Sequence, residues 1–134
     1  MSPTTVERIS VRTSDDVVVV RQRIRALAIQ AGLGLVDQTK IVTAASELAR
    51  NMVDFAGGGV AIIEIVEKDG RTGIRCTFED HGPGIPDISL AMRDGYTTGE
   101  GLGYGLGGAK RLSNEFNIET EIGKGTRVII ARWR

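Results

Sequence analysis

The period of the apolar positions changes several times along the chain, and each change marks an element. Loose alternation over Val6 to Arg12 predicts a first strand at a sheet edge. Two helical patterns follow, the first beginning at a cap in Ser14-Asp15-Asp16 and ending at Gly32 and Gly34. Its apolar stripe is Val17, Val20, Ile24, Leu27, Ala28 and Ala31. The second stripe is Ile41, Ala45, Leu48, Met52 and Phe55, with Asp37 as the expected cap and Gly57-Gly58-Gly59 as the stop.

The second half of the chain predicts four strands and further helices. Val60 to Glu67 and Gly73 to Glu79 form a hairpin through an Asp-Gly turn. A short helical piece near Ile88 to Met92 precedes a glycine-rich stretch. A third helix carries Leu106, Ala109, Leu112 and Phe116, and residues 116–122 and 126–133 close the chain as a hairpin. This order favours a two-layer sandwich with its helices on one side of the sheet, and it lacks the repeated βαβ units of a parallel dinucleotide fold.

Composition narrows the class of protein. The 134 residues fit a single domain spanning 1–134, and 17 basic against 17 acidic residues give a net charge of zero. We therefore expect neither nucleic acid nor a membrane as partner. One cysteine excludes an internal disulfide, and the lack of a signal peptide or an apolar span leads us to expect a cytoplasmic protein. The 18 glycines indicate that the backbone approaches something closely.

Candidate chemistry begins on the second predicted helix. Glu47 and Asn51 are four residues apart, so they lie on one edge of the apolar stripe, with Asp54 nearby. An Asn oxygen can bind Mg²⁺, and a Glu can orient or deprotonate a nucleophile. An ordinary solvated helix face has the same pattern, so this segment alone does not distinguish a catalytic site from an exposed polar surface.

The glycine motifs are equally ambiguous one by one. Asp80-His81-Gly82-Pro83-Gly84-Ile85 follows a strand and could hold a carboxylate at the floor of a pocket, or it could be an ordinary turn. Residues 101–108, Gly-Leu-Gly-Tyr-Gly-Leu-Gly-Gly, lead into a helix whose start could seat a phosphate, or they could serve helix packing. No Gly-Lys-Ser/Thr follows, so this is not a Walker P-loop. Gly123-Lys124-Gly125-Thr126 is first of all a hairpin turn.

In combination and in this order, the motifs resemble the GHKL superfamily of gyrase, heat-shock chaperone ATPases, histidine kinases and MutL over essentially the whole chain. The resemblance implies an α+β Bergerat fold with a mixed, mostly antiparallel sheet, and it implies ATP and Mg²⁺ as cofactors. Glu47 would be the general base, Asn51 the Mg²⁺ ligand and Asp80 the adenine reader. The other implied nucleotide contacts are Gly82, Gly84, Ile85, Gly101, Leu102, Gly103, Tyr104, Gly105, Leu106 and Thr126. A lid over about 87–103 is expected to become ordered when ATP binds.

Within the superfamily, Ser46-Glu47-Leu48-Ala49-Arg50-Asn51 and the stretch 82–88 look like the serine/threonine switch kinases of bacterial partner-switching modules and the stressosome. Such kinases phosphorylate a STAS-domain protein, then bind and activate a metal-dependent serine/threonine phosphatase or another output protein. Gly107 departs from the pattern, since many members have Pro there. Two alternatives stay open. One is an anti-sigma factor kinase, and the other is a non-catalytic module whose binding is gated by nucleotide.

Overall fold

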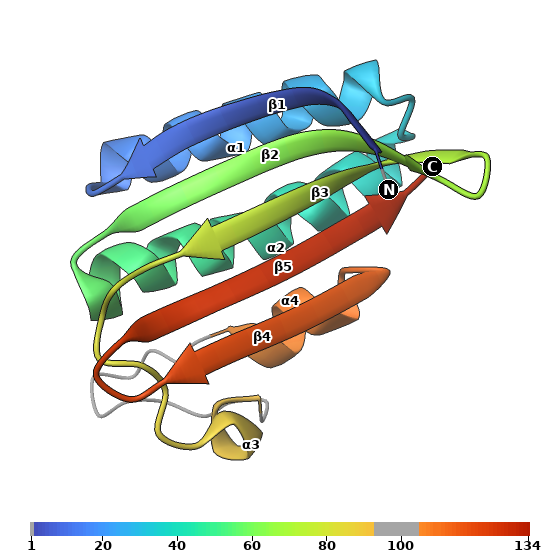
Figure 1. Ribbon diagram of the computed structural model, residues 1–134. Helices are drawn as coiled ribbons and strands as arrows, with labels where there is room; N and C mark the ends of the chain where they lie inside the picture. Colours follow the sequence, from blue (N-terminus) through green and yellow to red (C-terminus); the bar gives the residue numbers. More distant parts are fainter. Residues whose placement is uncertain (1, 93–104) are drawn as a thin grey trace.

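The computed structural model describes residues 2–92 and 105–134, with side chains from residue 5 onward (Figure 1). The first half contains β1 (Ser2–Val11), α1 (Ser14–Gln30), α2 (Leu35–Ala56), β2 (Gly59–Lys68) and β3 (Arg71–Glu79). The second half contains α3 (Ile88–Ala91), α4 (Leu106–Arg111), β4 (Glu115–Glu121) and β5 (Gly125–Trp133). The predicted order of elements is therefore confirmed.

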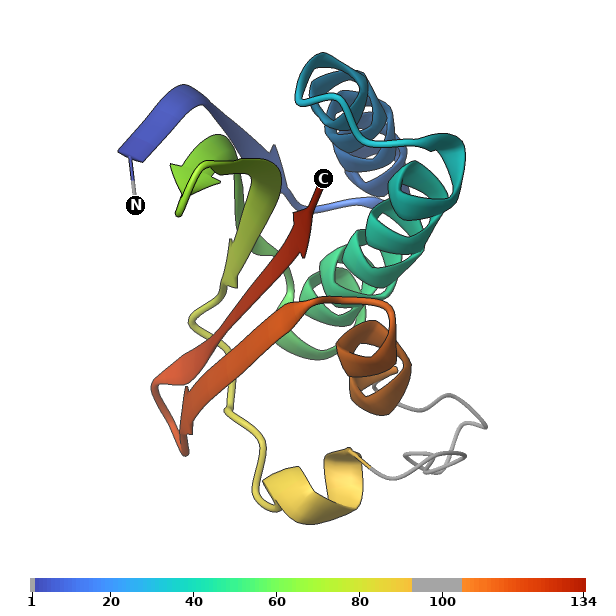
Figure 2. The same ribbon diagram turned by 90° about the vertical axis from the view of Figure 1, so that its right-hand side faces the viewer.

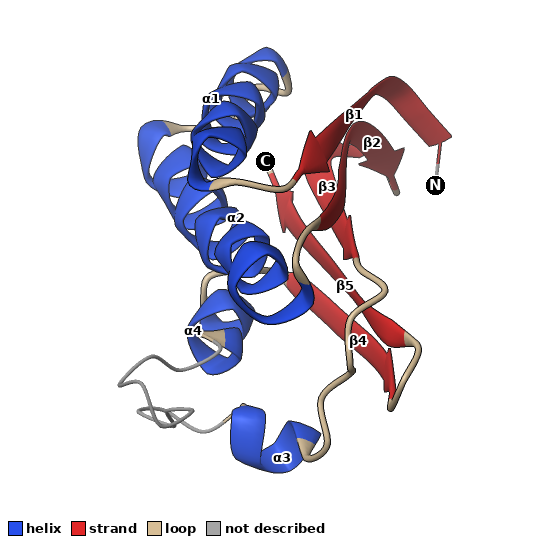
Figure 3. Cartoon of the chain, turned by 90° about the vertical axis from the view of Figure 1, so that its left-hand side faces the viewer, coloured by secondary structure: helices blue, strands red, loops and turns tan. Residues whose placement is uncertain are grey.

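The strands form one sheet in the order β1-β2-β3-β5-β4, and each neighbouring pair is antiparallel. The first strand lies at an edge, as predicted. Helices α1, α2 and α4 all lie on one face of this sheet (Figures 2 and 3). The structure thus confirms the two-layer α+β sandwich, and the strand pairs it describes are antiparallel throughout rather than mixed.

The core lies between the helices and the covered sheet face. Ile63, Ile74 and Ile130 from three strands are fully buried against Ile24 and Ile41 from the two long helices. Cys76, between Ile74 and Phe78 on the same face of β3, is also buried, and this burial raises the pKa of its thiol. Because α2 buries its apolar stripe here, its polar edge is fixed relative to the ends of β3 and β5.

The helix starts differ from the sequence predictions. Thr13, rather than the Ser14-Asp15-Asp16 segment itself, occupies the N-cap of α1, and the Asp16 carboxylate accepts from the backbone N–H groups of Arg12 (2.9 Å) and Thr13 (3.1 Å). These bonds lower the pKa of Asp16. Gly34, not Asp37, caps α2, so that prediction was wrong. Asp37 lies in the first turn of α2 and accepts instead from Arg132 Nε at 2.8 Å.

The third predicted helix is shorter than its apolar spacing suggested. Helix α4 ends at Arg111 with Leu112 as its C-cap, and Phe116 belongs to β4. The Asn114 N–H donates to the Ala131 carbonyl at 2.8 Å, so strand pairing takes over from the helix at this point. The spacing of Phe116 was misleading because its partly buried side chain packs against the core from a strand rather than from a helix.

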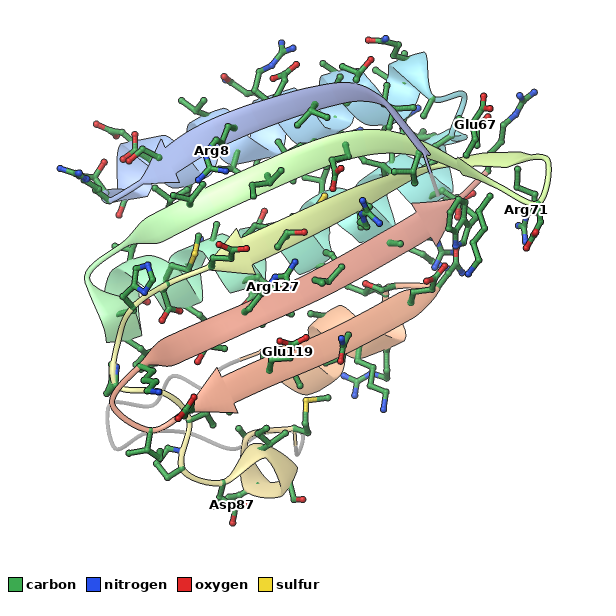
Figure 4. The ribbon with its side chains drawn as sticks, in the orientation of Figure 1. Arg8, Glu67, Arg71, Asp87, Glu119 and Arg127 are labelled. Atoms are coloured by element: carbon green, nitrogen blue, oxygen red, sulfur yellow. The ribbon has the colours of Figure 1, made fainter. Side chains whose placement is uncertain are left out.

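None of the helices in the described part of the chain covers the other face of the sheet (Figures 2 and 3). Figure 4 shows Glu119 and Arg127 on this face, on neighbouring strands. Ion pairs link Glu64 with Arg75 at 3.0 Å and Glu79 with Arg127 at 3.2 Å. Among the described residues, no helix is long and apolar enough to cross a membrane.

Candidate functional site

A cavity of about 130 Å³, partly open to solvent, lies between α2, the loop after β3 and the start of β5. Most of its wall is apolar. Three polar side chains, Asn51, Asp80 and Thr126, also line it. The remaining lining residues are Leu48, Met52, Phe55, Ala56, Phe78, Pro83, Gly84, Ile85, Leu106 and Val128. Such a combination of apolar walls and a few polar groups is typical of small-molecule sites.

Asp80 is held in place by backbone donors. Its Oδ1 accepts from the Gly82 N–H at 2.9 Å and from the Thr126 N–H at 3.2 Å. Its own N–H donates to the Thr126 carbonyl at 3.0 Å. All hydrogen bonds from described residues to this carboxylate end on Oδ1, so Oδ2 keeps its capacity to accept from a ligand. Backbone hydrogen bonds therefore join Asp80 to Thr126 at the start of β5.

The loop that follows Asp80 is packed on both sides, which explains its glycines. A Cβ on Gly82 would lie 2.5 Å from the Cβ of Ala56 at the end of α2. Gly84 has a φ of +82°, and a Cβ there would lie 2.6 Å from the carbonyl oxygen of Glu121. The Gly123 N–H of the β4–β5 turn donates to the Pro83 carbonyl at 2.9 Å. The loop is thus clamped between α2 and the closing hairpin. His81 in this loop is exposed.

Thr120 completes this end of the site, and sequence reasoning missed it. Its hydroxyl lies 2.8 Å from the Thr126 hydroxyl and accepts from the Ile85 N–H at 2.9 Å. Thr120 and Thr126 are direct partners in the β4–β5 register, with Thr120 six residues before Thr126. The predicted hairpin contained this signal, because pairing its strands outward from the turn brings the two threonines together.

The opposite end of the cavity is built from α2 and α4. Asn51 is half-buried in the wall, whereas Glu47, one turn earlier on the same edge of α2, is exposed. Gly105 has a φ of +67° and lies against the Glu47 side chain. Leu106, the first residue of α4, is buried and lines the cavity. Figure 2 shows α4 beside α2.

Most of the predicted site residues therefore meet. Six of them, Asn51, Asp80, Gly84, Ile85, Leu106 and Thr126, line one cavity. The Gly82 N–H donates to Asp80, and Gly125 lies close to the Asp80 carbonyl. Glu47 and Gly105 lie together where α4 meets α2. Gly101, Leu102, Gly103 and Tyr104, and the lid residues from 93 on, lie outside the described residues. Sequence reasoning also missed the contribution of Phe78 and Val128 to the apolar wall.

The described residues contain no group of three or more His, Cys, Asp or Glu side chains that could hold a metal ion. Asn51 supplies one amide side chain to the cavity wall. A single protein ligand of this kind suits Mg²⁺ that arrives with a phosphate ligand, because this ion keeps several waters and uses few protein groups in such sites.

Comparisons with known proteins agree with this geometry. A family model described as histidine kinase-, DNA gyrase B- and HSP90-like ATPase matches residues 36–134. The chain is 46% identical over 125 residues to the serine/threonine-protein kinase RsbT of Bacillus subtilis, covering 93% of this chain and 94% of the relative. It is 29% identical over 119 residues to the anti-sigma F factor of Geobacillus kaustophilus, covering 84% and 80% of the two chains.

Solved structures show the same fold. The RsbU and RsbW domains of a Mycobacterium tuberculosis protein match with a TM-score of 0.68 and 23% identity. That match covers 99% of this chain and 34% of the solved chain. The histidine kinase domain of a blue-light-activated kinase of Erythrobacter litoralis matches with a TM-score of 0.57 and 20% identity, covering 88% of this chain and 59% of that one. At these identities the two structures bear on the fold alone.

Proposed function

This chain belongs to the histidine kinase-, DNA gyrase B- and HSP90-like ATPase family, and we propose that it is an ATP-dependent serine/threonine protein kinase of a bacterial partner-switching pathway. Its substrate is a serine or threonine of a STAS-domain protein. Once released from that protein, the kinase binds and activates a metal-dependent serine/threonine phosphatase or another output protein. The observation that carries the proposal is the gathering of the family motifs around one cavity, in a chain 46% identical to a serine/threonine-protein kinase.

The end of the cavity at Asp80 suits adenine. The Oδ2 of Asp80, to which no described residue donates, can accept from the exocyclic amino group. The apolar walls from Phe78, Met52 and Val128 can cover the ring. The bonds from Gly82 and Thr126 fix the carboxylate before any ligand arrives, so little order is lost on binding. Gly84 and Ile85 also line this cavity.

The end at Asn51 suits the phosphates. Bound Mg²⁺ would neutralise charge on the phosphate oxygens, and Asn51, which lines the cavity, would supply its side-chain oxygen as a ligand. Gly101, Gly103, Gly105 and Leu106 are proposed to border the phosphates, with Leu102 and Tyr104 between them. These residues position the nucleotide, which is most of what phosphoryl transfer requires of a protein.

Glu47 is proposed as the general base. It is exposed, so the hydroxyl of a protein substrate can reach it from solvent. Glu47 accepts the hydroxyl proton while the substrate oxygen attacks the γ-phosphorus, the bond to the β–γ bridging oxygen breaks, and ADP leaves. The new phosphate adds about two negative charges at the interface with the partner. We infer that this charge weakens the complex and frees the kinase.

A second candidate is an anti-sigma factor kinase, because two curated relatives at 29% and 31% identity are anti-sigma F factors. The two candidates differ in the protein that the kinase binds after it leaves the STAS-domain partner.

The test is to mix the chain with a STAS partner and Mg-ATP, map the modified residue, and follow the complex by size-exclusion chromatography. Phosphate on a Ser or Thr, followed by loss of the complex and capture of a phosphatase, supports the switch kinase. Capture of a sigma factor in place of the phosphatase supports the anti-sigma kinase. Nucleotide-dependent binding without phosphate transfer would leave a non-catalytic module.

A further inference from the structure

The Thr120 hydroxyl joins three segments at the Asp80 end of the cavity. Its oxygen lies 2.9 Å from the Ile85 nitrogen, 3.2 Å from the Gly125 carbonyl oxygen and 2.8 Å from the Thr126 hydroxyl oxygen. The first contact holds the loop after β3, and the other two hold the β4–β5 hairpin. Thr120 itself does not line the cavity, whereas Thr126 and Asp80 do.

Counting protons fixes the direction of these bonds. A hydroxyl has one proton to donate and two lone pairs with which to accept. The Ile85 N–H must donate to Thr120, and the Gly125 carbonyl can only accept from it. Thr120 therefore donates its one proton to the Gly125 carbonyl. All three contacts can be hydrogen bonds only if the Thr126 hydroxyl donates to Thr120. The Thr126 oxygen is then left with acceptor capacity.

We propose that Thr120 is a positioning residue that sets the base specificity of the cavity. This inference rests on the proposed nucleotide binding and adds to it a residue outside the cavity. By taking the Thr126 proton, Thr120 leaves two acceptors, Thr126 Oγ1 and Asp80 Oδ2, among the cavity-lining side chains at this end. Two acceptors match a 6-amino purine, whose amino group donates, and they oppose a 6-oxo purine, whose oxygen only accepts.

Removing the Thr120 hydroxyl should relax this preference. In Thr120→Val the Thr126 proton has lost its acceptor and is free to turn to a 6-oxo group. The experiment is calorimetric titration of ATP and of inosine triphosphate, which carries the 6-oxo group, into the wild-type chain and its variants. We expect Thr120→Val to reduce the preference for ATP by about threefold to tenfold, the value of roughly one hydrogen bond. Thr120→Ser keeps the hydroxyl and should restore the wild-type preference.

The design separates specificity from folding. Thr72→Val makes the same change in β3, at a residue outside the cavity lining, and should leave the preference unchanged. Thr120→Ala removes the hydroxyl without filling its place, and carries the same prediction should the valine variant fail to fold. If wild type prefers ATP and the hydroxyl-free variant keeps that preference, the inference is overturned while the proposed function stands. If wild type binds neither nucleotide, the proposed function fails, and this inference with it.

Discussion

The carboxylate of Glu47 on α2 lies directly against Gly105, the N-cap residue of α4. A Cβ added to Gly105 would lie 2.7 Å from Glu47 Oε2 and 3.2 Å from Glu47 Cβ. The backbone of Gly105 is also left-handed, with a φ of +67°, which side chains rarely adopt. Two independent constraints therefore require glycine beside the proposed base.

Gly105→Ala should lower phosphate transfer to the partner by at least about tenfold, because the added methyl pushes against Glu47 and the left-handed backbone costs about 1–2 kcal/mol for a residue with a Cβ. The initial rate of transfer from Mg-ATP measures this. Gly108→Ala is the matched control, since among the described residues its Cβ would meet nothing closer than Arg111 Nη2 at 3.8 Å. Equal rates in the two variants would contradict the proposed contact between Gly105 and the base.

Asp80→Asn should weaken ATP binding by roughly tenfold to a hundredfold, the range expected for hydrogen bonds to a charged group. The amide oxygen can still accept from Gly82 and Thr126, but the amide NH₂ then faces the amino group of the base, where two donors meet. Calorimetric titration with ATP measures the change. Asp54→Asn, at an exposed position on α2, provides the control. A similar loss in both variants would argue against a specific role for Asp80.

Arg132→Met should lower the free energy of unfolding by about 1–3 kcal/mol. The Arg132 side chain is 14% exposed and donates to Asp37 at 2.8 Å and to the Leu112 carbonyl at 3.2 Å. It therefore joins the start of α2 and the end of α4 to β5. Arg127→Met, which breaks the more exposed pair with Glu79, should cost less than about 1 kcal/mol. Urea unfolding followed by the fluorescence of Trp133, the one tryptophan in the chain, compares them. Equal losses would show that burial does not distinguish these two ion pairs.

Acid should remove the contribution of Glu7 to stability. The hydrogen bond and charge of Arg23 lower the pKa of Glu7 below 4.5, its value in an unfolded chain. A lowered pKa means that this stability is complete above about pH 4.5 and is lost as pH falls through the folded pKa. The difference in unfolding free energy between wild type and Glu7→Gln should therefore shrink between pH 6 and pH 3. Glu67→Gln, at an exposed position of β2, is the control, and a difference for Glu7→Gln that stays constant with pH would contradict the prediction.

The long elements could be predicted because their signals are local. The stripe from Ile41 to Phe55 repeats at helical spacing, and Gly57, left-handed in the structure, ends α2 where the glycine run indicated. The predicted N-caps of α1 and α2 were wrong because the N-cap is the residue whose backbone is still extended just before the helix. Thr13 and Gly34 hold that conformation, whereas Asp37 lies within the helix and binds Arg132, 95 residues away.

Residues of the site could be predicted only where they belong to a recognisable sequence motif. Asp80 and Thr126 stand in recognisable glycine motifs, and the structure joins them by hydrogen bonds. Thr120 stands in no motif, and its role depends on strand register and on where the loop at Ile85 lies. The contact between Glu47 and Gly105 likewise depends on how α4 packs on α2, which no local pattern encodes.

The central claim is that this chain transfers phosphate from ATP to a partner protein with Glu47 as the base. Intact-mass spectrometry of a purified STAS-domain partner, incubated with Mg-ATP and the chain, tests it most directly. Wild type should add one phosphate to the partner, Asn51→Asp and Glu47→Gln should add none at the same time point, and Glu67→Gln should match wild type. A partner phosphorylated equally by wild type and Glu47→Gln would contradict the assignment of the base. A partner left unmodified by a wild-type chain that binds ATP and this partner would contradict the kinase itself.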